Sequence, residues 1–387
     1  MSDIQLVARE LTCPACESSF VLHTPKSRAY QLARRDADFC PHYEGLNPLF
    51  YQVWVCPRCS FAAYKEHWGP LSEVERVGMR QLSSESTEGL RFDFSQPERT
   101  LFAAILSYKL AYRFYLRRMP TSYDHLGGVQ MRLAWLCRIG NDRKREIQHL
   151  GAAIVHFAEA FDHGRKLSMS EGKIAYLLGE LNRRIGNGEG AVDWYMRAIK
   201  MDPAKGEVYR MSRDQLYEAK ESIRFFQHLQ MVEFLKPLPI EHVAELAAQV
   251  KSHRVVPGGK ICSKGEQATS MFIIVKGAVR IHPGDVSEPQ LATLTVGQYF
   301  GEACLLTGQL RNATAIADQA AEVLEIDRVA FKTVLASNSE IAAELRRMLS
   351  FRAEQMERWR GEVTGGKTEP KGPDGFMMRL LNYFDVR

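Results

Sequence analysis

Two closely spaced pairs of cysteines near the start of the sequence restrict the folds open to this chain. Both pairs have the pattern Cys-Pro-x-Cys, and they consist of Cys13 with Cys16 and of Cys56 with Cys59. Each pair places two thiolates on one tight turn, and two such turns can supply the four corners of a tetrahedron around a zinc ion. Four cysteine ligands fill the coordination shell, so we expect the metal to have a structural role.

The residues between the two pairs are expected to form structure of their own. Residues 17–55 separate the pairs, which exceeds the roughly 15–20 residues of a compact zinc site. Residues 50–55 are aromatic and β-branched and predict a strand that leads into the second pair. Cys40, His42 and His67 are possible substitute ligands, but we expect them to be bystanders. A redox dithiol is the alternative, although no thioredoxin-like βαβ pattern surrounds either pair.

The sequence around these cysteines resembles an uncharacterised bacterial protein family. The resemblance rests on residues 38–40, 47–51 and 55–63, and it extends over residues 5–215. It implies a paired-cysteine, zinc-ribbon-like segment followed by helices, and it implies no activity. The family usually has glycine directly after the second pair, whereas this chain has Ser60.

Residues 72–220 have the periodicity of helices and no clear strands. Apolar residues recur three and four positions apart, as at Leu101, Ile105 and Tyr108. One stretch also matches the spacing of the 34-residue tetratricopeptide repeat, at Leu178, Gly179, Ala191, Tyr195, Ala198 and Pro203. Asn182 stands where that repeat usually has an aromatic residue. The small residues predict two antiparallel helices in close contact.

A looser copy of this repeat precedes it. Leu133, Leu136 and Gly140 suggest its first helix, and Phe157 and Ala160 suggest its second. Extra residues at 142–148 lengthen the middle of the copy.

Stacked helical hairpins need terminal helices that close the array. The helices expected at residues 97–118 and 212–229 can have this role. Such arrays usually present a concave surface to a peptide or protein partner. A plain helical spacer between two domains is the alternative.

A different pattern begins after Phe234. Short apolar runs separated by glycine turns predict a small β-barrel or jelly roll. Within it, Gly301 allows the backbone to approach a ligand closely, and residues 303–306 can form a short helix whose amides point at an anion. Arg311 offers a fork of donors for phosphate oxygens, and Glu302 can accept a hydrogen bond from a ribose hydroxyl. The combination suits a sugar phosphate better than phosphate alone.

These residues resemble the phosphate-binding cassette of cyclic-nucleotide-binding domains, as in regulatory subunits of cyclic-AMP-dependent kinases and in catabolite activator proteins. The resemblance extends over residues 222–345. It implies that Glu302 binds the ribose 2′-hydroxyl, that Arg311 binds the cyclic phosphate, and that the amides of Ala303 and Ala313 complete the cradle.

Two positions depart from the cassette pattern. The usual proline before the arginine is Leu310, and the residue after it, often small or a hydroxyl, is Asn312. Because Asn312 stands where the family contacts the base or phosphate, the choice between cyclic AMP and cyclic GMP stays open. A domain that keeps the fold and no longer binds is the alternative.

The end of the sequence predicts a lid in place of a DNA-reading unit. Residues 341–360 form one expected helix, which would swing over the base with Phe351 or Trp359 stacked on it. A linker at residues 361–375 and a short amphipathic end at residues 376–384 follow. These residues are too few for a winged helix-turn-helix, so we expect no sequence-specific DNA binding.

Composition excludes several classes of function. The formal net charge of +5 over 387 residues is too dilute to indicate nucleic-acid binding. No run approaches about 18 apolar residues, so we expect no membrane-spanning helix. The first residues lack the apolar core of a signal peptide, which predicts a cytoplasmic protein. We find no P-loop, nucleophile elbow, kinase or metal-hydrolase motif, and we expect no enzyme.

The sequence therefore predicts a multidomain α+β protein. It comprises a zinc-ribbon-like module (1–70), tetratricopeptide-like helical repeats (71–220), a cyclic-nucleotide-binding barrel with a lid helix (221–360) and a linker with a short tail (361–387). The expected function is that of a bacterial adaptor that senses cyclic AMP or cyclic GMP and relays this to a protein partner through the repeats. The alternatives are a cyclic-dinucleotide sensor, with Arg280 or Arg328 as a second phosphate ligand, and a constitutive zinc-stabilised scaffold with a non-binding barrel.

Overall fold

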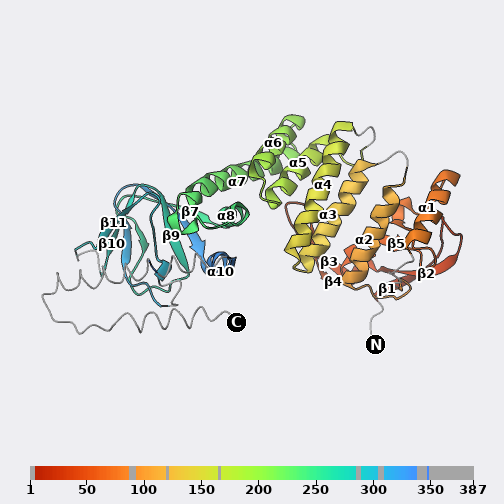
Figure 1. The fold of residues 1–387 in the computed structure, drawn as a ribbon, viewed down its shortest axis with the longest axis horizontal. Coiled ribbons are helices and arrows are strands. Elements are labelled where there is room, and N and C mark those ends of the chain that lie inside the picture. Colours follow the sequence, from red (N-terminus) through yellow and green to blue (C-terminus); the bar gives the residue numbers. More distant parts are fainter. Residues whose placement is uncertain are drawn as a thin grey trace. The chain divides into compact units, whose positions relative to one another are not determined.

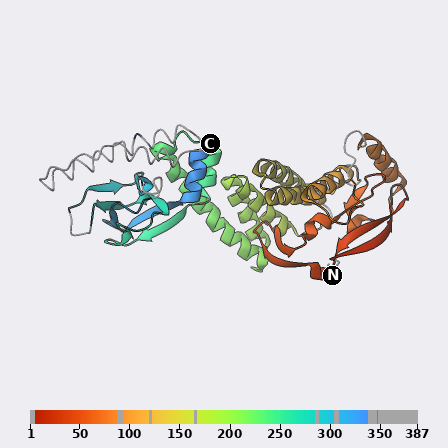
Figure 2. The same ribbon diagram turned by 90° about the horizontal axis from the view of Figure 1, so that it is seen from below.

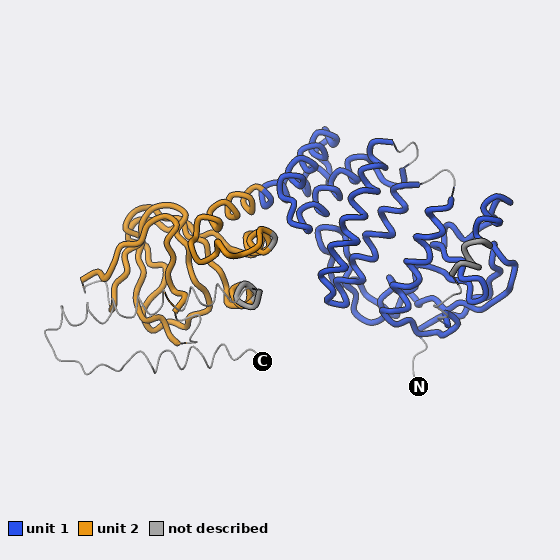
Figure 3. The backbone as a smooth tube through the Cα atoms, in the orientation of Figure 1, with its two compact units in different colours: residues 1–219 blue, residues 220–387 orange. Residues whose placement is uncertain are grey.

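The computed structural model describes residues 5–86, 93–118, 122–163, 167–284, 289–303, 309–337 and 347. The chain divides into two compact units, residues 1–219 (unit 1) and residues 220–387 (unit 2) (Figure 3). The division lies within helix α7 (Glu207–Gln230), at the end of the predicted helical segment. The expected lid helix with Phe351 and Trp359, the linker and the tail lie outside the described residues, apart from residue 347.

Unit 1 combines three strand pairs with a layer of helices (Figure 1). Its strands are β1 (Leu6–Thr12), β2 (Ser19–Pro25), β3 (Tyr30–Arg35), β4 (Pro41–Gly45), β5 (Val53–Val55) and β6 (Ala62–Tyr64). Its helices are α1 (Glu73–Ser86), α2 (Leu101–Tyr115), α3 (Tyr123–Ile139), α4 (Arg143–His163), α5 (Glu171–Arg184) and α6 (Gly188–Met201), followed by α7. The strands form three antiparallel pairs: β1 with β2, β3 with β4, and β5 with β6. In Figure 2 the strands of unit 1 lie along one side of the helix layer.

The predicted strand at residues 50–55 is shorter than expected. Residues Pro48–Tyr51 form a 3₁₀ turn, and only Val53–Val55 are extended. The turn forms because the side chain of Asn47 accepts a hydrogen bond from the amide of Leu49 and Pro48 occupies the first position.

The cysteine-bearing segment and the helices share one hydrophobic core. The cluster of buried residues runs from Cys13 through Phe61 to Leu181. The rings of Phe61 and Phe114 lie 5.2 Å apart, and the amide of Tyr64 donates to the Tyr115 hydroxyl over 3.0 Å. The segments predicted as separate modules at residues 1–70 and 71–220 are therefore parts of one unit.

Helices α5 and α6 approach closely where the sequence places a glycine. A Cβ atom at Gly179 would lie 2.6 Å from Cδ1 of Tyr195, which is fully buried. The same relationship occurs in the preceding hairpin, where a Cβ at Gly127 would lie 2.8 Å from Cδ1 of Phe157. Both pairs of helices depend on a glycine that faces an aromatic ring.

The residues of the looser copy lie in α3 and α4. Gly140 is the residue that ends α3, with φ −83° and ψ 4°, and the close approach to α4 occurs at Gly127. The extra residues at 142–148 lie at the start of α4, which begins at Arg143.

Unit 2 is a sandwich of two four-stranded antiparallel sheets, in the strand orders β11-β10-β13-β8 and β12-β9-β14-β7. Its strands are β7 (Lys251–Val255), β8 (Lys260–Cys262), β9 (Ser270–Lys276), β10 (Ala278–His282), β11 (Ala292–Thr295), β12 (Tyr299–Phe300), β13 (Thr314–Ala317) and β14 (Ala321–Asp327). Its helices after α7 are α8 (Ile240–Ala247) and α10 (Arg328–Ser337), with a 3₁₀ turn at Glu233–Leu235. This is the predicted jelly roll.

Strand β9 lies at the centre of unit 2 and is buried on both faces. Phe272 and Ile274 pack in the core between the sheets. Met271 and Ile273 point the other way, into a second core that contains Phe234 and residues of α8 and α10. Burial on both faces explains why the strand is a continuous apolar run instead of an alternating one.

Among the described residues, we find no helix with both the length and the apolar character needed to cross a membrane.

Candidate functional site

Arg311 and Gly301 of the predicted cassette lie in contact. Gly301 follows β12 and has a φ of +85°, in the left-handed region that favours glycine. The carbonyl oxygen of Gly301 accepts a hydrogen bond from Nη1 of Arg311 over 3.1 Å. A Cβ atom at residue 301 would lie 2.4 Å from that same nitrogen. Glycine is therefore favoured by the turn, and a side chain at residue 301 would displace the end of the arginine side chain.

The guanidinium group of Arg311 is buried, and its direct contacts are with neutral groups. The residue is 6% exposed, and the guanidinium carbon lies 5.4 Å from the centre of the Phe272 ring. Phe272 is stacked on Phe300, and Nη2 of Arg311 is 3.5 Å from Oγ of Ser270. In the described part of the chain, Arg311 makes no ion pair with a carboxylate. A buried cation in such surroundings is suited to an anionic ligand.

The backbone on both sides of Arg311 is held by the turn before β9. The amide of Arg311 donates to the carbonyl of Glu266, and the amide of Gly265 donates to the carbonyl of Arg311, each over 2.8 Å. Gln267 forms an isolated bridge with Leu310. These bonds fix the direction in which the arginine side chain leaves the backbone.

The other cassette residues differ in their exposure to solvent. Glu302 is buried, Ala303 and Ala313 are half-buried, and Asn312 is exposed. Residues 304–308 lie outside the described residues, and with them most of the short helix predicted at 303–306.

Sequence reasoning missed two residues beside Arg311. Ser270 and Phe272 stand at alternate positions of β9, so both side chains point to the same face of the strand. The period-two spacing is visible in the sequence, but nothing there links this strand to Arg311.

The two arginines considered for a second phosphate have partners within the protein. Nε of Arg280 lies 3.0 Å from the carboxylate of Asp318. Nη2 of Arg328 donates to the carbonyl of Ala268 over 2.7 Å.

The four paired cysteines form a second candidate site, in unit 1. The sulfur atoms of Cys13 and Cys59 are 3.6 Å apart, and those of Cys16 and Cys56 are 3.7 Å apart. All four sulfurs lie within 4.8 Å of one another. A tetrahedral zinc ion with zinc–sulfur bonds of about 2.3 Å separates its sulfurs by about 3.8 Å. The donor set and the spacing therefore fit zinc.

Proton sharing inside this cluster favours a bound cation. The hydrogen bond with Cys56, together with burial, raises the pKa of Cys13 to about 12. The pKa of Cys59 is also raised, because Cys13 and Cys56 compete with it for the negative charge. Without a cation the four thiols cannot all ionise, whereas a metal ion binds them as thiolates.

The two cysteine pairs lie on near-identical turns. The amide of Glu17 donates to the carbonyl of Cys13, and the amide of Ser60 donates to the carbonyl of Cys56, each over 2.9 Å. Glu17 and Ser60 have φ angles of 58° and 61°, in the left-handed region. This conformation explains why glycine is usual at the position of Ser60.

The possible substitute ligands lie elsewhere. Cys40 and His42 gather with Asp36 in a separate group, whose ligand atoms also lie within 4.8 Å of one another. Arg34 and Arg138 contact the carboxylate of Asp36, which opposes a cation there. His67 hydrogen-bonds the Tyr115 hydroxyl over 2.7 Å instead of joining the cysteines.

Comparison with known proteins identifies both units. Residues 252–338 match the model of the cyclic nucleotide-binding domain, so unit 2 contains a domain of that class. Residues 6–219, more than half of the chain, match the family described as "Uncharacterized protein conserved in bacteria (DUF2225)". The protein belongs to this bacterial family.

Relatives resemble only part of the chain. The cyclic nucleotide-gated channel beta-3 of Mus musculus is 32% identical over 113 residues, which are 28% of this chain and 16% of the channel. A cyclic nucleotide-gated potassium channel of Rhizobium etli is 30% identical over 128 residues, 33% of this chain and 35% of the channel. A solved structure of cAMP-bound PfPKA-R is 26% identical with a TM-score of 0.34, and the match covers 39% of this chain and 52% of that one. The chain thus spans well under half the length of these curated relatives.

Proposed function

We propose that unit 2 binds a cyclic mononucleotide, cyclic AMP or cyclic GMP, and that the protein is a sensor and adaptor rather than an enzyme. The observation that carries this proposal is the buried guanidinium of Arg311, held by the carbonyl of Gly301 and by Ser270 without a carboxylate partner among the described residues. It lies in a domain that matches the cyclic nucleotide-binding model.

In this proposal different residues bind different parts of the ligand. Arg311 binds the cyclic phosphate and gives up its bond to the carbonyl of Gly301 when the ligand enters. Glu302 accepts a hydrogen bond from the ribose 2′-hydroxyl, and the amides of Ala303 and Ala313 donate hydrogen bonds to phosphate oxygens. Asn312 is exposed and stands next to Arg311, where it can contact the base or the phosphate.

The test is titration calorimetry of the full chain with cyclic AMP, cyclic GMP and common cyclic dinucleotides. We expect saturable binding of one cyclic mononucleotide. Arg311→Ala should weaken its binding by at least about tenfold, since one charged hydrogen bond contributes about 1.5–3 kcal/mol. Arg311→Lys keeps the positive charge and loses the fork of donors, so its affinity should lie between those of the wild type and Arg311→Ala. Equal affinity of wild type and Arg311→Ala would contradict the assignment of Arg311 to the binding site. Binding of a cyclic dinucleotide alone would show that the ligand is a dinucleotide.

We also propose that Cys13, Cys16, Cys56 and Cys59 hold a structural zinc ion. The sulfur spacing and the closed set of four thiols support this assignment. The metal would supply no chemistry and would fix the two turns on which β2 and β6 depend. Elemental analysis of the purified chain should find one zinc per molecule.

We further propose that nucleotide occupancy is relayed to a protein partner through the helical hairpins of unit 1, in the cytoplasm. The repeat-like spacing from Leu178 to Pro203 and the glycine–aromatic contacts of both hairpins support such an array. Affinity capture with and without the nucleotide found by calorimetry would test the relay, and identical partners in both conditions would contradict it.

A further inference from the structure

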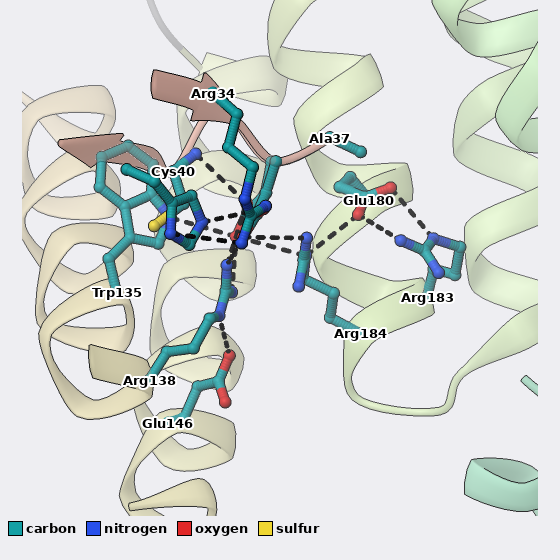
Figure 4. A network of polar contacts seen from close by, with 12 residues as sticks. Arg34, Ala37, Cys40, Trp135, Arg138, Glu146, Glu180, Arg183 and Arg184 are labelled. Atoms are coloured by element: carbon teal, nitrogen blue, oxygen red, sulfur yellow. Dashed lines mark hydrogen bonds and ion pairs between the residues drawn. The ribbon is translucent and has the colours of Figure 1, made fainter. Parts of the chain in front are cut away.

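A short acidic segment of unit 1, the turn of the β3–β4 hairpin, packs against the helices. Residues 36–40, which connect β3 to β4, are defined here as the acidic segment (Figure 4). Its backbone is held by a side chain from α5, because the Tyr176 hydroxyl donates to the carbonyl oxygen of Ala37 over 2.8 Å. Its side chains are held by α3 and α5 together. These helices are the first members of their two hairpins.

Two arginines of the helices bind the two carboxylates of the acidic segment, and Arg34 and His42 of the β3–β4 hairpin also contact Asp36. Nη2 of Arg138 lies 2.7 Å from Asp38, and Nη1 lies 2.9 Å from Asp36. Nε of Arg184 lies 3.3 Å from the same Asp38, which also accepts a hydrogen bond from Trp135 over 3.1 Å. Asp38 is fully buried, whereas the side chains of Arg138 and Arg184 are 19% and 18% exposed.

Carboxylates of the helices hold the guanidinium groups of both arginines in place. Glu146 of α4 lies 2.7 Å from Nε of Arg138, and Glu180 of α5 lies 3.0 Å from Nε of Arg184. Figure 4 shows the two arginine side chains directed toward the same point between the helices. The receptor side of this contact is therefore organised by residues outside the acidic segment.

The aromatic residue of the segment has its own contacts. The ring of Phe39 lies 5.5 Å from the ring of Tyr176, and Nζ of Lys173 lies 4.9 Å from its centre. Phe39 has a φ of 63°, which is strained for a residue with a side chain. The hairpin turn holds this conformation, because the amide of Asp36 donates to the carbonyl of Cys40 and the amide of Phe39 donates to the carbonyl of Asp36, each over 2.9 Å.

We propose that the face formed by α3 and α5 is a groove for acidic peptides of the form Asp-x-Asp-aromatic, and that the chain closes this groove with its own acidic segment. A partner that carries such a sequence binds by displacing residues 36–40. The inference deepens the proposed relay by naming the kind of partner. Its test uses no nucleotide, so it can fail while nucleotide binding stands.

The first experiment releases the acidic segment without changing its shape. The full chain with Asp36→Asn and Asp38→Asn is titrated into a fluorescein-labelled peptide of residues 34–43 that carries Cys40→Ser. Saturable binding is expected, at least tenfold tighter than to the wild-type chain, in which the groove is occupied. Adding Arg138→Ala to the double variant should abolish it, as should a peptide with both aspartates changed to asparagine. A folded double variant that binds no better than wild type would overturn the proposal.

The second experiment needs only the wild-type chain and decides the case if the double variant fails to fold. Cys40 is fully buried, so an alkylating reagent reaches it only when the acidic segment leaves the groove. Excess aspartate peptide should hold the segment out and accelerate labelling of Cys40 several-fold, as measured by mass spectrometry. The asparagine peptide should leave the rate unchanged. A rate that does not respond to the aspartate peptide would also overturn the proposal.

Discussion

Gly301 and Arg311 form a single structural device, because the arginine donates to the carbonyl of the glycine and occupies the space that a side chain at residue 301 would need. Nη1 of Arg311 is 3.1 Å from that carbonyl oxygen and would be 2.4 Å from a Cβ atom. The close approach places a buried positive charge at the point where the strand β12 ends. An anion that enters there meets a guanidinium whose direction is already fixed.

Gly301→Ala is expected to weaken nucleotide binding by displacing Arg311. The matched control is Gly297→Ala, because Gly297 has nearly the same φ of +84° and a Cβ atom added there would have no neighbour within 4 Å. Both variants should lose about 1–2 kcal/mol of stability from the left-handed backbone. Only Gly301→Ala should also lose affinity in calorimetry. Equal affinities in the two variants would show that the contact with Arg311 has no part in binding.

Gly179→Ala should destabilise unit 1 by about 1–3 kcal/mol, as expected for overpacking a core. The Tyr195 ring that it meets is fully buried, and its hydroxyl is held by Glu180 over 2.8 Å, so the ring has little freedom to move. Gly151→Ala in α4 is the control, since nothing lies within 4 Å of that position. It should stabilise the helix by about 0.5–1 kcal/mol. Urea unfolding measures both, and a stabilising Gly179→Ala would contradict the packing described for the hairpin.

Ser60→Gly should stabilise unit 1 by up to about 1 kcal/mol, because it removes a left-handed serine from the second cysteine turn. Glu17→Gly relieves the same strain in the first turn but loses the ion pair of Glu17 with Arg76, which spans 2.8 Å. It should therefore gain less. Thermal unfolding compares the two, and a loss of stability in Ser60→Gly would show that the turn does not strain the serine.

Removal of the proposed zinc ion should unfold unit 1 as a whole and leave unit 2 folded. The reason is the shared core, which joins Cys13 to helices as distant in sequence as α5. Structural zinc contributes about 10–16 kcal/mol in zinc-finger peptides, which is comparable to the total stability of a domain. Hydrogen exchange with a chelator, and with Cys59→Ser, measures this. Helices that keep their protection after the metal is lost would contradict the shared core, and simultaneous loss of both units would contradict their independence.

Local features of the fold followed from the sequence where a short pattern determines the structure. The cysteine turns, the glycine–aromatic contact of α5 with α6 and the strands of unit 2 each depend on residues close together in the chain. Asn182 shows how a departure from a pattern is accommodated, since its side chain bonds the carbonyl of Leu178 and the side chain of Asn187. A polar residue replaces an aromatic one because the turn after α5 supplies partners for it.

Features that depend on distant parts of the chain could not be predicted in this way. Arg138 and Asp38 are a hundred positions apart in sequence, and no local pattern indicates that they meet. The contact of Gly127 with Phe157 joins residues thirty positions apart, and the repeat spacing does not single out Gly127. Ser270 and Phe272 have no sequence link to Arg311 for a related reason, since a sheet brings them together.

The most direct measurement is calorimetric titration of the full wild-type chain with cyclic AMP and cyclic GMP, repeated with Arg311→Ala. The account predicts saturable binding of one of the two at a single site in the wild type, and a loss of at least about tenfold in the variant. Binding that is unchanged in Arg311→Ala, or no binding of either nucleotide by the wild-type chain, would contradict it.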